Sequence, residues 1–317
     1  MKQVKARGQV EPGMNVAILL STYNGVRYLP EQLASLAAQT HAAWKLYVRD
    51  DGSSDATLGL LRRFAEAHPG RVEIRAANNV GAVASFLELL GRLEIEADAF
   101  AFCDQDDVWY SDKLARAVAW LAQAGEDPAL YCTRVRLVDA QLRPKGLSPL
   151  IGSWGFQHAL FENIAMGCTT VLNRKAHTLL AERLPPAKGI TVHDWWCYLA
   201  IAAVGRVHFD PQPSLDYRLH QGNVIGLTTG RAAEILRQVR LFARNPRTFF
   251  QTHRQIASLL AKFGDLLSEP QRSLVSDLVE VKGQPLPRLW VALRAPVRRQ
   301  RRLDAAVTRT LIALGLY

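Results

Sequence analysis

Short apolar segments typical of buried strands alternate with helical segments through the first half of the chain. Residues that start and stop helices separate them: Pro30 stands in one first turn, and Pro69-Gly70 follows another helix. Repeated strand–helix–strand units predict an α/β fold, with a mostly parallel sheet covered by helices on both faces. The expected strands are 15–21, 45–49, 72–76, 99–103 and 129–139, and the expected helices are 29–39, 56–67, 112–125 and one within 78–93.

The second half of the chain changes from mixed to helical. After Gly230, apolar residues recur every three or four positions, which predicts helices with one apolar face. We therefore expect a flexible N-terminus at 1–14, a main α/β domain at 15–228 and a basic helical region at 229–317. A loop is expected at 143–157, further elements at 168–173, 175–184, 193–205, 206–210 and 215–219, and a helical stripe of Phe249, Ile256, Leu260, Phe263 and Leu267.

The positive charge of the chain is confined to its last part. Residues 1–230 hold 23 basic and 23 acidic residues, whereas residues 231–317 hold 16 basic and 6 acidic, which accounts for the net charge of +10. This asymmetry predicts an anionic partner for the end of the chain. A nucleic acid ranks last among such partners, because no recognition fold accompanies the basic residues.

The segment 286–317 combines this charge with an apolar stripe. A basic amphipathic segment can lie on an anionic membrane surface. Equally, the stripe can pack on the main domain and leave its arginines solvated, and both interpretations stay open at this point. The arginines are Arg294, Arg298, Arg299, Arg301 and Arg302, and the stripe is Leu303, Val307, Leu311 and Leu314.

Cysteine spacing and hydropathy exclude several classes of protein. The four cysteines are scattered, so neither a structural zinc site nor a disulfide framework is indicated. The apolar run 16–20 is too short for the core of a signal peptide, and the run 195–205 falls far short of the roughly 20 residues that span a bilayer. We therefore expect a cytoplasmic protein, which the basic segment can hold at the inner face of the cell membrane.

Two acidic clusters follow expected strands. Asp50 and Asp51 come after one strand, and Asp104, Asp106 and Asp107 come after another. In open α/β sheets the ligand crevice lies beyond the carboxyl ends of the strands. Two like charges 4 Å apart repel by about 4 kcal/mol at an effective dielectric of 20, so crowded carboxylates favour a bound cation. Because Mg²⁺ binds one or two carboxylates plus substrate phosphates, the crevice suits a metal-chelated diphosphate.

Both acidic clusters also allow other interpretations. The first can be a simple turn with a helix cap, and the second a solvated loop. An EF-hand is excluded because Trp109 and Ala115 stand where glycine and glutamate are required. An apolar strand followed by D-x-D-x-V also resembles the nucleophile motif of haloacid-dehalogenase-type phosphohydrolases, with Asp104 attacking phosphorus, although three strands precede it here. Neither a Walker A motif nor GxGxxG is present.

Five motifs, taken in order, identify a resemblance. They are VAILLSTYNGVRYLPEQLASLAAQTHAAWKLYVRDDGSSDAT, FCDQDDVWYSDKL, MGCTTVLNR, HDWWCYLA and YRLHQGN. Together they resemble glycosyltransferase family 2, over roughly residues 15–225, and within it the bacterial rhamnosyltransferases that extend O-antigen or other rhamnose-containing surface polysaccharides. The resemblance implies the GT-A fold, a Rossmann-like sheet that binds a nucleotide sugar, as the catalytic domain. It also implies transfer with inversion and a Mg²⁺ or Mn²⁺ cofactor.

The resemblance implies roles for residues that hold the nucleotide. Thr22 and Tyr23, together with Asp50 and Asp51, match the positions around the base. Tyr23 would pack on the base, and Asp51 would accept a hydrogen bond from it.

Other matching positions lie at the diphosphate and at the acceptor. Asp104 would lie near the ribose and the metal, Asp106 would bind the metal, and Asp107 would support either role. His220 falls where a late residue approaches the metal or diphosphate, although a lone histidine is more often a loop residue. Asp194 matches the general base, although it is also a plausible helix N-cap.

The two adjacent tryptophans and the substrates complete the expectation. Trp195 and Trp196 diverge by about 100° around one helix, so one is expected in the core and the other in the floor of the acceptor site. The implied donor is dTDP-L-rhamnose, with UDP-hexose or UDP-N-acetylhexosamine as alternatives, and the implied acceptor is a polyprenyl-diphosphate-linked glycan. A non-catalytic protein that binds nucleotides or glycans stays a further alternative.

Overall fold

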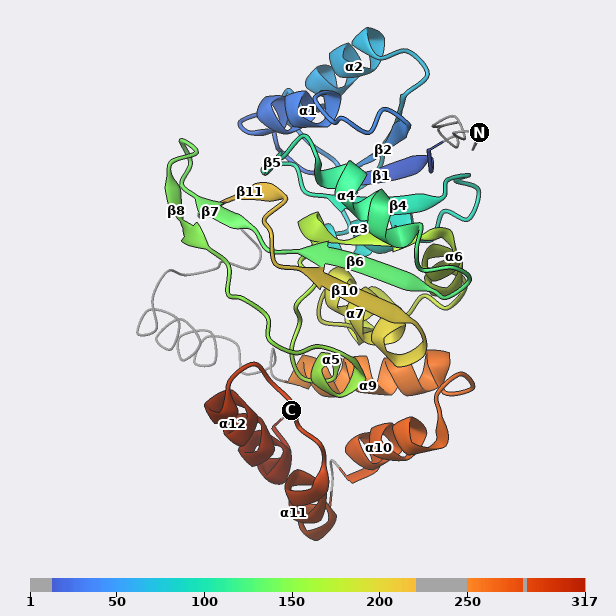
Figure 1. The fold of residues 1–317 in the computed structure, drawn as a ribbon, viewed down its shortest axis with the longest axis vertical. Helices are drawn as coiled ribbons and strands as arrows, with labels where there is room; N and C mark the ends of the chain where they lie inside the picture. The colour runs from blue at the N-terminus through green and yellow to red at the C-terminus, as the bar shows by residue number, and fades with distance from the viewer. Residues whose placement is uncertain (1–12, 221–249, 282–283, 317) are drawn as a thin grey trace, which may run out of the picture.

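The computed structural model describes residues 13–220, 250–281 and 284–316, which form two sheets and their covering helices (Figure 1). In the main sheet the strand order is β10-β6-β9-β4-β1-β2-β3, and β9 runs antiparallel to both of its neighbours while the others are parallel. Its strands are β1 (Val16–Thr22), β2 (Trp44–Asp50), β3 (Val72–Ala76), β4 (Ala99–Cys103), β6 (Ala129–Thr133), β9 (Val171–Asn173) and β10 (Arg206–Asp210).

A second, smaller sheet has the order β5-β11-β7-β8. It joins residues far apart in sequence, because β11 pairs with β5 on one side and β7 on the other. This sheet stands at the end of the main sheet where the loop after β4 emerges (Figure 1). Its strands are β5 (Val108–Trp109), β7 (Arg136–Val138), β8 (Pro144–Leu147) and β11 (Leu215–Arg218).

Helices cover both faces of the main sheet and build two separate cores. Successive residues of a strand point to opposite faces, so Ile18 and Leu20 enter one core while Ala17 and Leu19 enter the other. The first core is covered by α1 (Leu29–Ala37), α2 (Thr57–Ala67) and α4 (Lys113–Leu121), and the second by α3 (Ala82–Leu90), α5 (Phe156–Ala159), α6 (Arg174–Glu182) and α7 (His193–Val204).

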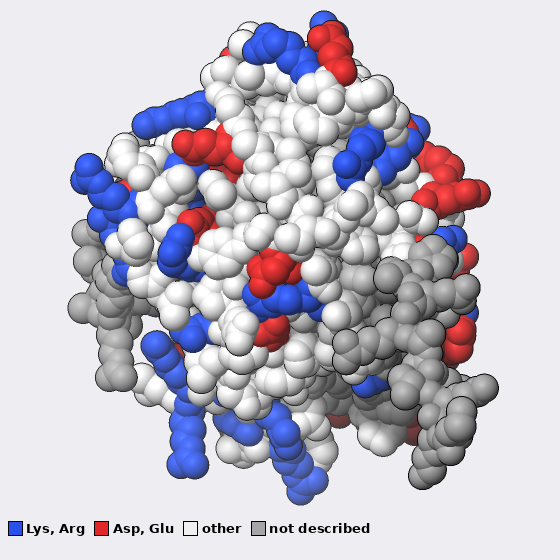
Figure 2. All heavy atoms as spheres, turned by 45° about the horizontal axis from the view of Figure 1, so that its top comes forward, with Lys and Arg blue, Asp and Glu red and all other residues white. Residues whose placement is uncertain are grey.

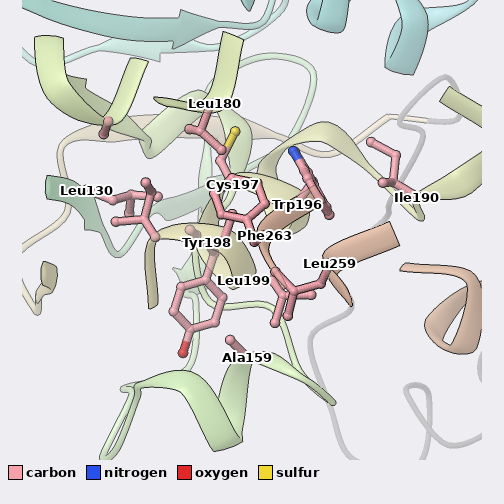
Figure 3. Packing of buried hydrophobic residues seen from close by; sticks show 14 of the residues in the cluster. Leu130, Ala159, Leu180, Ile190, Trp196, Cys197, Tyr198, Leu199, Leu259 and Phe263 are labelled. Carbon is pink, nitrogen blue, oxygen red and sulfur yellow. The ribbon is translucent and has the colours of Figure 1, made fainter. Parts of the chain in front are cut away.

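Four C-terminal helices gather at the lower end of the molecule in Figure 1 and extend the second core. Trp196 of α7 meets Phe263 edge-on, with ring centroids 5.7 Å apart, and Figure 3 shows both rings among the aliphatic side chains of this cluster. None of the described helices combines the length and apolar character needed to cross a bilayer. The four are α9 (Phe250–Phe263), α10 (Glu269–Glu280), α11 (Pro285–Arg294) and α12 (Arg302–Leu314).

The predicted α/β class with a mostly parallel sheet is confirmed, and the departures lie after β4. The segment 129–139 divides between the two sheets, and β8 lies in the expected loop 143–157. Most of the predicted N-terminus 1–14, Phe249 and the boundary at 228 lie outside the described residues. All four cysteines are buried and free.

Candidate active site

Three loops follow neighbouring parallel strands and meet at one edge of the main sheet. In the order β4-β1-β2, these strands place the segments 23–28, 51–56 and 104–107 side by side. In open α/β sheets, ligand crevices lie beyond this edge, outside the carboxyl ends of the strands. The loops carry most of the residues that the sequence predicts to bind a nucleotide and a metal.

One side chain joins the first loop to the third. Gln105 accepts a hydrogen bond from the Tyr23 amide at 2.9 Å and donates one to the Tyr23 carbonyl at 3.0 Å. The Gly25 backbone lies so close to Gln105 that a Cβ on Gly25 would lie 2.2 Å from the Gln105 side-chain oxygen. The Tyr23 side chain itself is 49% exposed, which leaves its ring available to a flat ligand.

Asp50 builds the second loop. Its carboxylate accepts hydrogen bonds from the Thr22 hydroxyl at 2.8 Å and from the Ser53 amide and hydroxyl at 2.9 and 2.6 Å. Thr22 and Asp50 are also partners in the β1–β2 register. Both residues are at most 1% exposed. Both side chains therefore shape the loop, and their contact with a nucleotide stays a prediction.

Asp51 orients the segment that leads into α3. It pairs with Arg49 at 2.5 Å and accepts hydrogen bonds from the amides of Val80 and Gly81 at 2.8 and 2.9 Å. An ionised carboxylate offers about four acceptor sites. One site is thus left for the predicted contact with a base, which stays a prediction.

The loop after β4 gathers three carboxylates with different surroundings. Asp104 and Asp106 keep some exposed surface, whereas Asp107 is completely buried. Burial first, and then the charges of Asp106 and Asp194, raise the pKa of Asp104 to about 8. Burial, with repulsion from Asp106 and Asp104, also raises the pKa of Asp107 well above its ordinary value. A cation among these groups would relieve that repulsion.

Asp104, Asp107 and Cys168 form a compact group in which one ligand atom from each lies within 4.8 Å of the others. Oδ2 of Asp107 is buried and has no hydrogen-bond partner among the described residues. Burial raises the pKa of the Cys168 thiol well above its usual range, so its sulfur stays protonated at neutral pH. The carboxylate oxygens are therefore the part of this group that suits a hard cation.

A buried lysine stands close to the same group. Lys113 is 1% exposed, and its Nζ lies 4.5 Å from the centroid of the Trp109 ring. Burial lowers the pKa of Lys113 to about 8, against the opposing effects of Cys168, Cys103 and Asp107. When protonated, Lys113 sets one positive charge against the three carboxylates from inside the protein.

Strand β11 holds the carboxylate loop from the other side. Arg218 is 1% exposed; its Nε donates to the Asp106 carbonyl at 2.9 Å, and its amide donates to Asp107 at 3.3 Å. The same guanidinium forms an ion pair with Glu31 of α1. Nε2 of His220 lies 2.9 Å from Oδ2 of Asp106. The structure thus brings the predicted metal-site residues Asp106 and His220 together.

Asp194 lies in the first turn of α7 and is 8% exposed. Its carboxylate accepts hydrogen bonds from the amides of Gly167 and Trp195 at 2.7 and 2.5 Å and from the Asn163 amide group at 3.1 Å. The N-cap residue of α7 is Val192, so the alternative interpretation of Asp194 as the N-cap is wrong.

The electrostatic surroundings of Asp194 suit a proton acceptor. Burial raises its pKa to about 6, against the effect of its three hydrogen bonds. Its charge in turn raises the pKa of Asp104, which places the two carboxylates within electrostatic reach of each other. A Cβ at Gly167 would lie 2.9 Å from His193 Nε2 and 3.4 Å from Asp194 Oδ2, so glycine is needed for this approach.

Sequence comparison assigns the family. The profile described as Glycosyl transferase family 2 matches residues 17–178, just over half of the chain, from β1 into α6. The chain belongs to glycosyltransferase family 2. The matched range holds all three loops at the edge of the sheet, and membership removes the phosphohydrolase alternative for Asp104.

Curated relatives of this glycosyltransferase include an enzyme from Shigella flexneri named dTDP-rhamnosyl transferase RfbG. It is 28% identical over 65% of this chain and 73% of its own length. An uncharacterized glycosyltransferase from a Nostoc species, alr2836, is 32% identical over 33% of this chain and 32% of its own length. The match thus spans most of the first relative but about a third of the second.

Solved structures share the fold of this glycosyltransferase over nearly its whole length. The mannosyltransferase PcManGT from Pyrobaculum calidifontis, solved with GDP-Man and Mn2+, superposes with a TM-score of 0.51 at 20% identity, covering 96% of this chain and 91% of the other. TarS 1-349 from S. aureus with UDP gives a TM-score of 0.53 at 14% identity, covering 95% and 91%. At these identities the likeness shows the fold.

The two adjacent tryptophans of the glycosyltransferase differ in their surroundings. Trp196 is completely buried and packs against Phe263, so it is the member of the pair that lies in the core. Trp195 is half-buried on the same core, and its indole donates to the Ala159 carbonyl at 2.7 Å. The part of Trp195 that stays exposed is what can face an acceptor.

Several residues of the site were not singled out from the sequence. Lys113 and Cys168 lie within quoted motifs, but nothing in their spacing shows that the fold brings them to Asp107. Asn163 and Arg218 are separated from their partners by 31 and 112 positions. Gln105 carried the one available signal, because it lies between two of the acidic residues.

The residues present fit a divalent cation. Asp104 and Asp106 offer carboxylate oxygens with some exposed surface, and Asp107 adds a buried oxygen without a partner among the described residues. Mg²⁺ and Mn²⁺ prefer this kind of donor. Divalent metals are common in enzymes of this fold.

Proposed function

We propose that this glycosyltransferase transfers L-rhamnose from dTDP-L-rhamnose, with inversion, to a lipid-linked glycan during synthesis of a cell-surface polysaccharide. The observation that carries the transfer chemistry is the buried Asp194 carboxylate, whose pKa of about 6 suits a base at neutral pH. The donor is proposed from the 28% identity with the Shigella flexneri dTDP-rhamnosyl transferase.

At the acceptor end, Asp194 acts as the general base. It takes the proton of the acceptor hydroxyl while that oxygen forms a bond to the anomeric carbon and the nucleoside diphosphate leaves with the bonding electrons. The amides of Gly167 and Trp195 and the side chain of Asn163 fix the carboxylate. Attack opposite the leaving group inverts the anomeric centre, so a β-linked donor gives an α-L-rhamnoside.

At the donor end, Tyr23 packs on the base and Asp51 accepts a hydrogen bond from it. Asp104 and Asp106, with His220 beside Asp106, bind the cation at the diphosphate. When bound, Mg²⁺ or Mn²⁺ supplies Lewis-acid stabilisation of the charge that develops on the leaving group. The Mn2+ in the mannosyltransferase structure supports this proposal.

A different donor is the main alternative. An Escherichia coli relative, 25% identical over 50% of this chain and 59% of its own length, is named a UDP-Glc:alpha-D-GlcNAc-diphosphoundecaprenol beta-1,3-glucosyltransferase. Its name supports both a UDP-hexose as the alternative donor and a polyprenyl-diphosphate glycan as the acceptor here. TarS 1-349, solved with UDP-GlcNAc, superposes with a TM-score of 0.50 and supports a UDP-N-acetylhexosamine as a second alternative donor.

The place and the parts of the enzyme belong to the same proposal. An acceptor on the inner leaflet requires the enzyme at the cytoplasmic face of the cell membrane. We assign donor and acceptor chemistry to residues 15–228 and treat the flanking ranges 1–14 and 229–317, the second of which is basic, as separate parts of the chain.

A nucleotide-sugar panel tests the donor. The full chain with Mn²⁺ is incubated with dTDP-L-rhamnose, UDP-glucose or UDP-N-acetylglucosamine, and its melting temperature and the released nucleotide are measured. We expect the largest shift, and slow hydrolysis of the donor, with dTDP-L-rhamnose. A larger shift with either UDP sugar contradicts the rhamnose proposal, and shifts without any turnover on a polyprenyl-diphosphate acceptor favour a non-catalytic binding protein.

A further inference from the structure

Helix α11 turns its apolar stripe outward. Leu286, Leu289, Trp290 and Leu293 recur at the spacing of one helical face, and they are 81%, 51%, 51% and 73% exposed. The opposite face of α11 supplies Val291 and Ala292 to the core. A surface helix ordinarily shows the reverse arrangement, with its larger apolar side chains inward.

Helix α12 repeats this arrangement. Leu303, Val307 and Leu314 lie along one face and are 71%, 51% and 59% exposed, whereas Ile312 on another face is completely buried. The sequence-based alternative, in which this stripe packs on the main domain, is therefore wrong for these three residues. The two helices pack against each other at the lower end of the molecule in Figure 1.

The arginines of this region divide into two groups. Arg299 binds Glu162 and Thr308, and Arg309 donates to the carbonyl groups of Ala292 and Leu293 at the end of α11. These inward arginines fix the two helices to each other and to the body.

A second group of arginines faces outward. Arg298, Arg301 and Arg302 are exposed and join no ion pair among the described residues, and Arg294 lies over the Trp290 ring at 4.3 Å. Residues 285–317 hold seven arginines and one acidic residue, Asp304. Figure 2 shows basic side chains projecting from the lower edge of the molecule. The apolar stripes are thus bordered by uncompensated positive charge.

The positive charge of the exposed face of α11 and α12 distinguishes among the surfaces that could bind to it. A second copy would bring seven more arginines and one aspartate against it, which is repulsive. The segment 221–249 carries five arginines and one glutamate, so it also has the wrong sign. An anionic lipid surface offers both negative headgroups and an apolar layer for the leucines and the tryptophan.

We propose that α11, α12 and the residues between them form a docking face for an anionic lipid bilayer. The stripes Leu286-Leu289-Trp290-Leu293 and Leu303-Val307 enter the boundary between headgroups and acyl chains, and Arg298, Arg301 and Arg302 bind the headgroups. Trp290 suits this depth, because its ring is apolar and its N–H is polar. This binding requires no donor and no turnover, so its test is independent of the proposed function.

Vesicle flotation with the full chain tests the docking face. Vesicles of phosphatidylcholine with phosphatidylglycerol are compared with vesicles of phosphatidylcholine alone, at low and high salt. We expect binding to the mixed vesicles, loss of most binding in high salt, and a blue shift of tryptophan emission that Trp290→Phe removes.

Matched variants distinguish binding through the docking face from nonspecific adsorption to the vesicles. Each basic residue near an anionic surface contributes about fivefold in affinity, so the Arg301→Gln/Arg302→Gln protein should bind about thirtyfold more weakly. Leu289→Ser should weaken binding about tenfold. The controls are Arg62→Gln/Arg63→Gln and Leu93→Ser, which change exposed residues of the same types away from α11 and α12 and should bind like the native chain.

Several results overturn the proposal. The first is that the native protein does not float with the mixed vesicles. Another is equal weakening by the control variants. A third is a dimer in size-exclusion chromatography that Leu289→Ser dissociates while vesicle binding is unchanged, because a second copy then covers the face. Circular dichroism of each variant verifies folding, which is expected because all the substituted side chains are exposed.

Discussion

A single residue, Asp194, combines two opposing effects. Burial raises its pKa to about 6, while three hydrogen bonds favour the ionised form and hold it in place. The folded protein therefore holds this proton more tightly than the unfolded chain between pH 3.8 and about 6. Its ionisation lowers the stability of the fold as pH rises through that window. Above about pH 6, Asp194 is a partly desolvated carboxylate, which is a stronger base than a solvent-exposed carboxylate.

The first prediction concerns this proton. Turnover should rise with pH through about 6 and level off, because the protonated carboxyl group cannot accept the acceptor proton. Asp194→Asn should lower kcat by about 10²- to 10⁴-fold while leaving donor binding within a few-fold of the native value. Steady-state rates across pH and calorimetric titration with the nucleotide measure the two parts.

Asp112→Asn is the matched control for this variant, because Asp112 is an aspartate with a 54% exposed side chain. It should leave both the rate and its pH dependence unchanged. Near-native turnover by Asp194→Asn, or a flat profile between pH 5 and 7, would show that another group takes the proton.

At the residue scale, the sequence predicted which side chains follow the strands of the main sheet better than it predicted how buried each one is. The acidic residues after β2 and β4 were found because polar groups after an apolar strand are a local signal. Burial is not local: Thr22 and Asp50 face each other only through the β1–β2 register, and Trp196 faces Phe263 only through packing between helices 67 positions apart. Residue type and spacing cannot report such distances.

At the scale of elements, the loops after β1 and β4 behave as one unit. The two hydrogen bonds between Gln105 and the Tyr23 backbone join these loops at the edge of the main sheet. Gly25 completes the fit, because any larger residue there meets the Gln105 side chain. The proposed contact of Tyr23 with the nucleotide base thus depends on Gln105, a residue of the loop that we propose binds the metal.

A double-mutant cycle tests this unit. Gly25→Ala should destabilise the protein by about 1 kcal/mol, because the new Cβ displaces the flexible end of Gln105 and breaks its exposed hydrogen bonds to Tyr23, and should weaken nucleotide binding. In the Gln105→Ala background the same change should cost much less, since the obstructing side chain is gone. Urea unfolding and nucleotide titration of the four proteins measure the coupling.

Gly59→Ala is the control for the glycine change. It lies in α2, and its Cβ would meet only the end of Arg63 at 3.6 Å, so a small gain in stability is expected. Equal costs of Gly25→Ala in both backgrounds would show that its effect does not pass through Gln105.

The elements themselves were predicted unevenly, for a physical reason. The strands β1 to β4 and their helices were found because apolar runs and helix signals are local and strong there. The second sheet was missed because β11 joins β5 and β7 across gaps of more than 75 residues. Short strands of this kind are stabilised by distant partners and leave little pattern in their own sequence.

At the scale of the whole molecule, nucleotide and metal should stabilise the protein together. A ligand that binds the folded state at a hundred times its dissociation constant adds about 2.7 kcal/mol. We expect dTDP with Mn²⁺ to raise the melting temperature more than the sum of either alone, because the cation joins the carboxylate loop to the diphosphate. Differential scanning fluorimetry measures this, with EDTA as the metal-free reference.

Asp106→Ala should remove the part of the shift that depends on Mn²⁺ and leave the part due to nucleotide alone. Asp98→Ala is a suitable control, since Asp98 lies at the opposite end of β4 from the carboxylate loop. The same shift with and without EDTA in the native protein would refute a role for metal in donor binding.

Helix α7 carries Asp194, the proposed general base, in its first turn and, two positions later, the Trp196 ring that packs against Phe263 of α9. A shortened enzyme ending near residue 228 would therefore lose more than an accessory tail. Without Phe263 and its neighbours, the indole of Trp196 would open onto water and the anchoring of Asp194 would loosen. A shortened protein for crystallisation should therefore keep the chain at least through α9. A shorter one is expected to hold Asp194 less firmly in position toward the donor sugar.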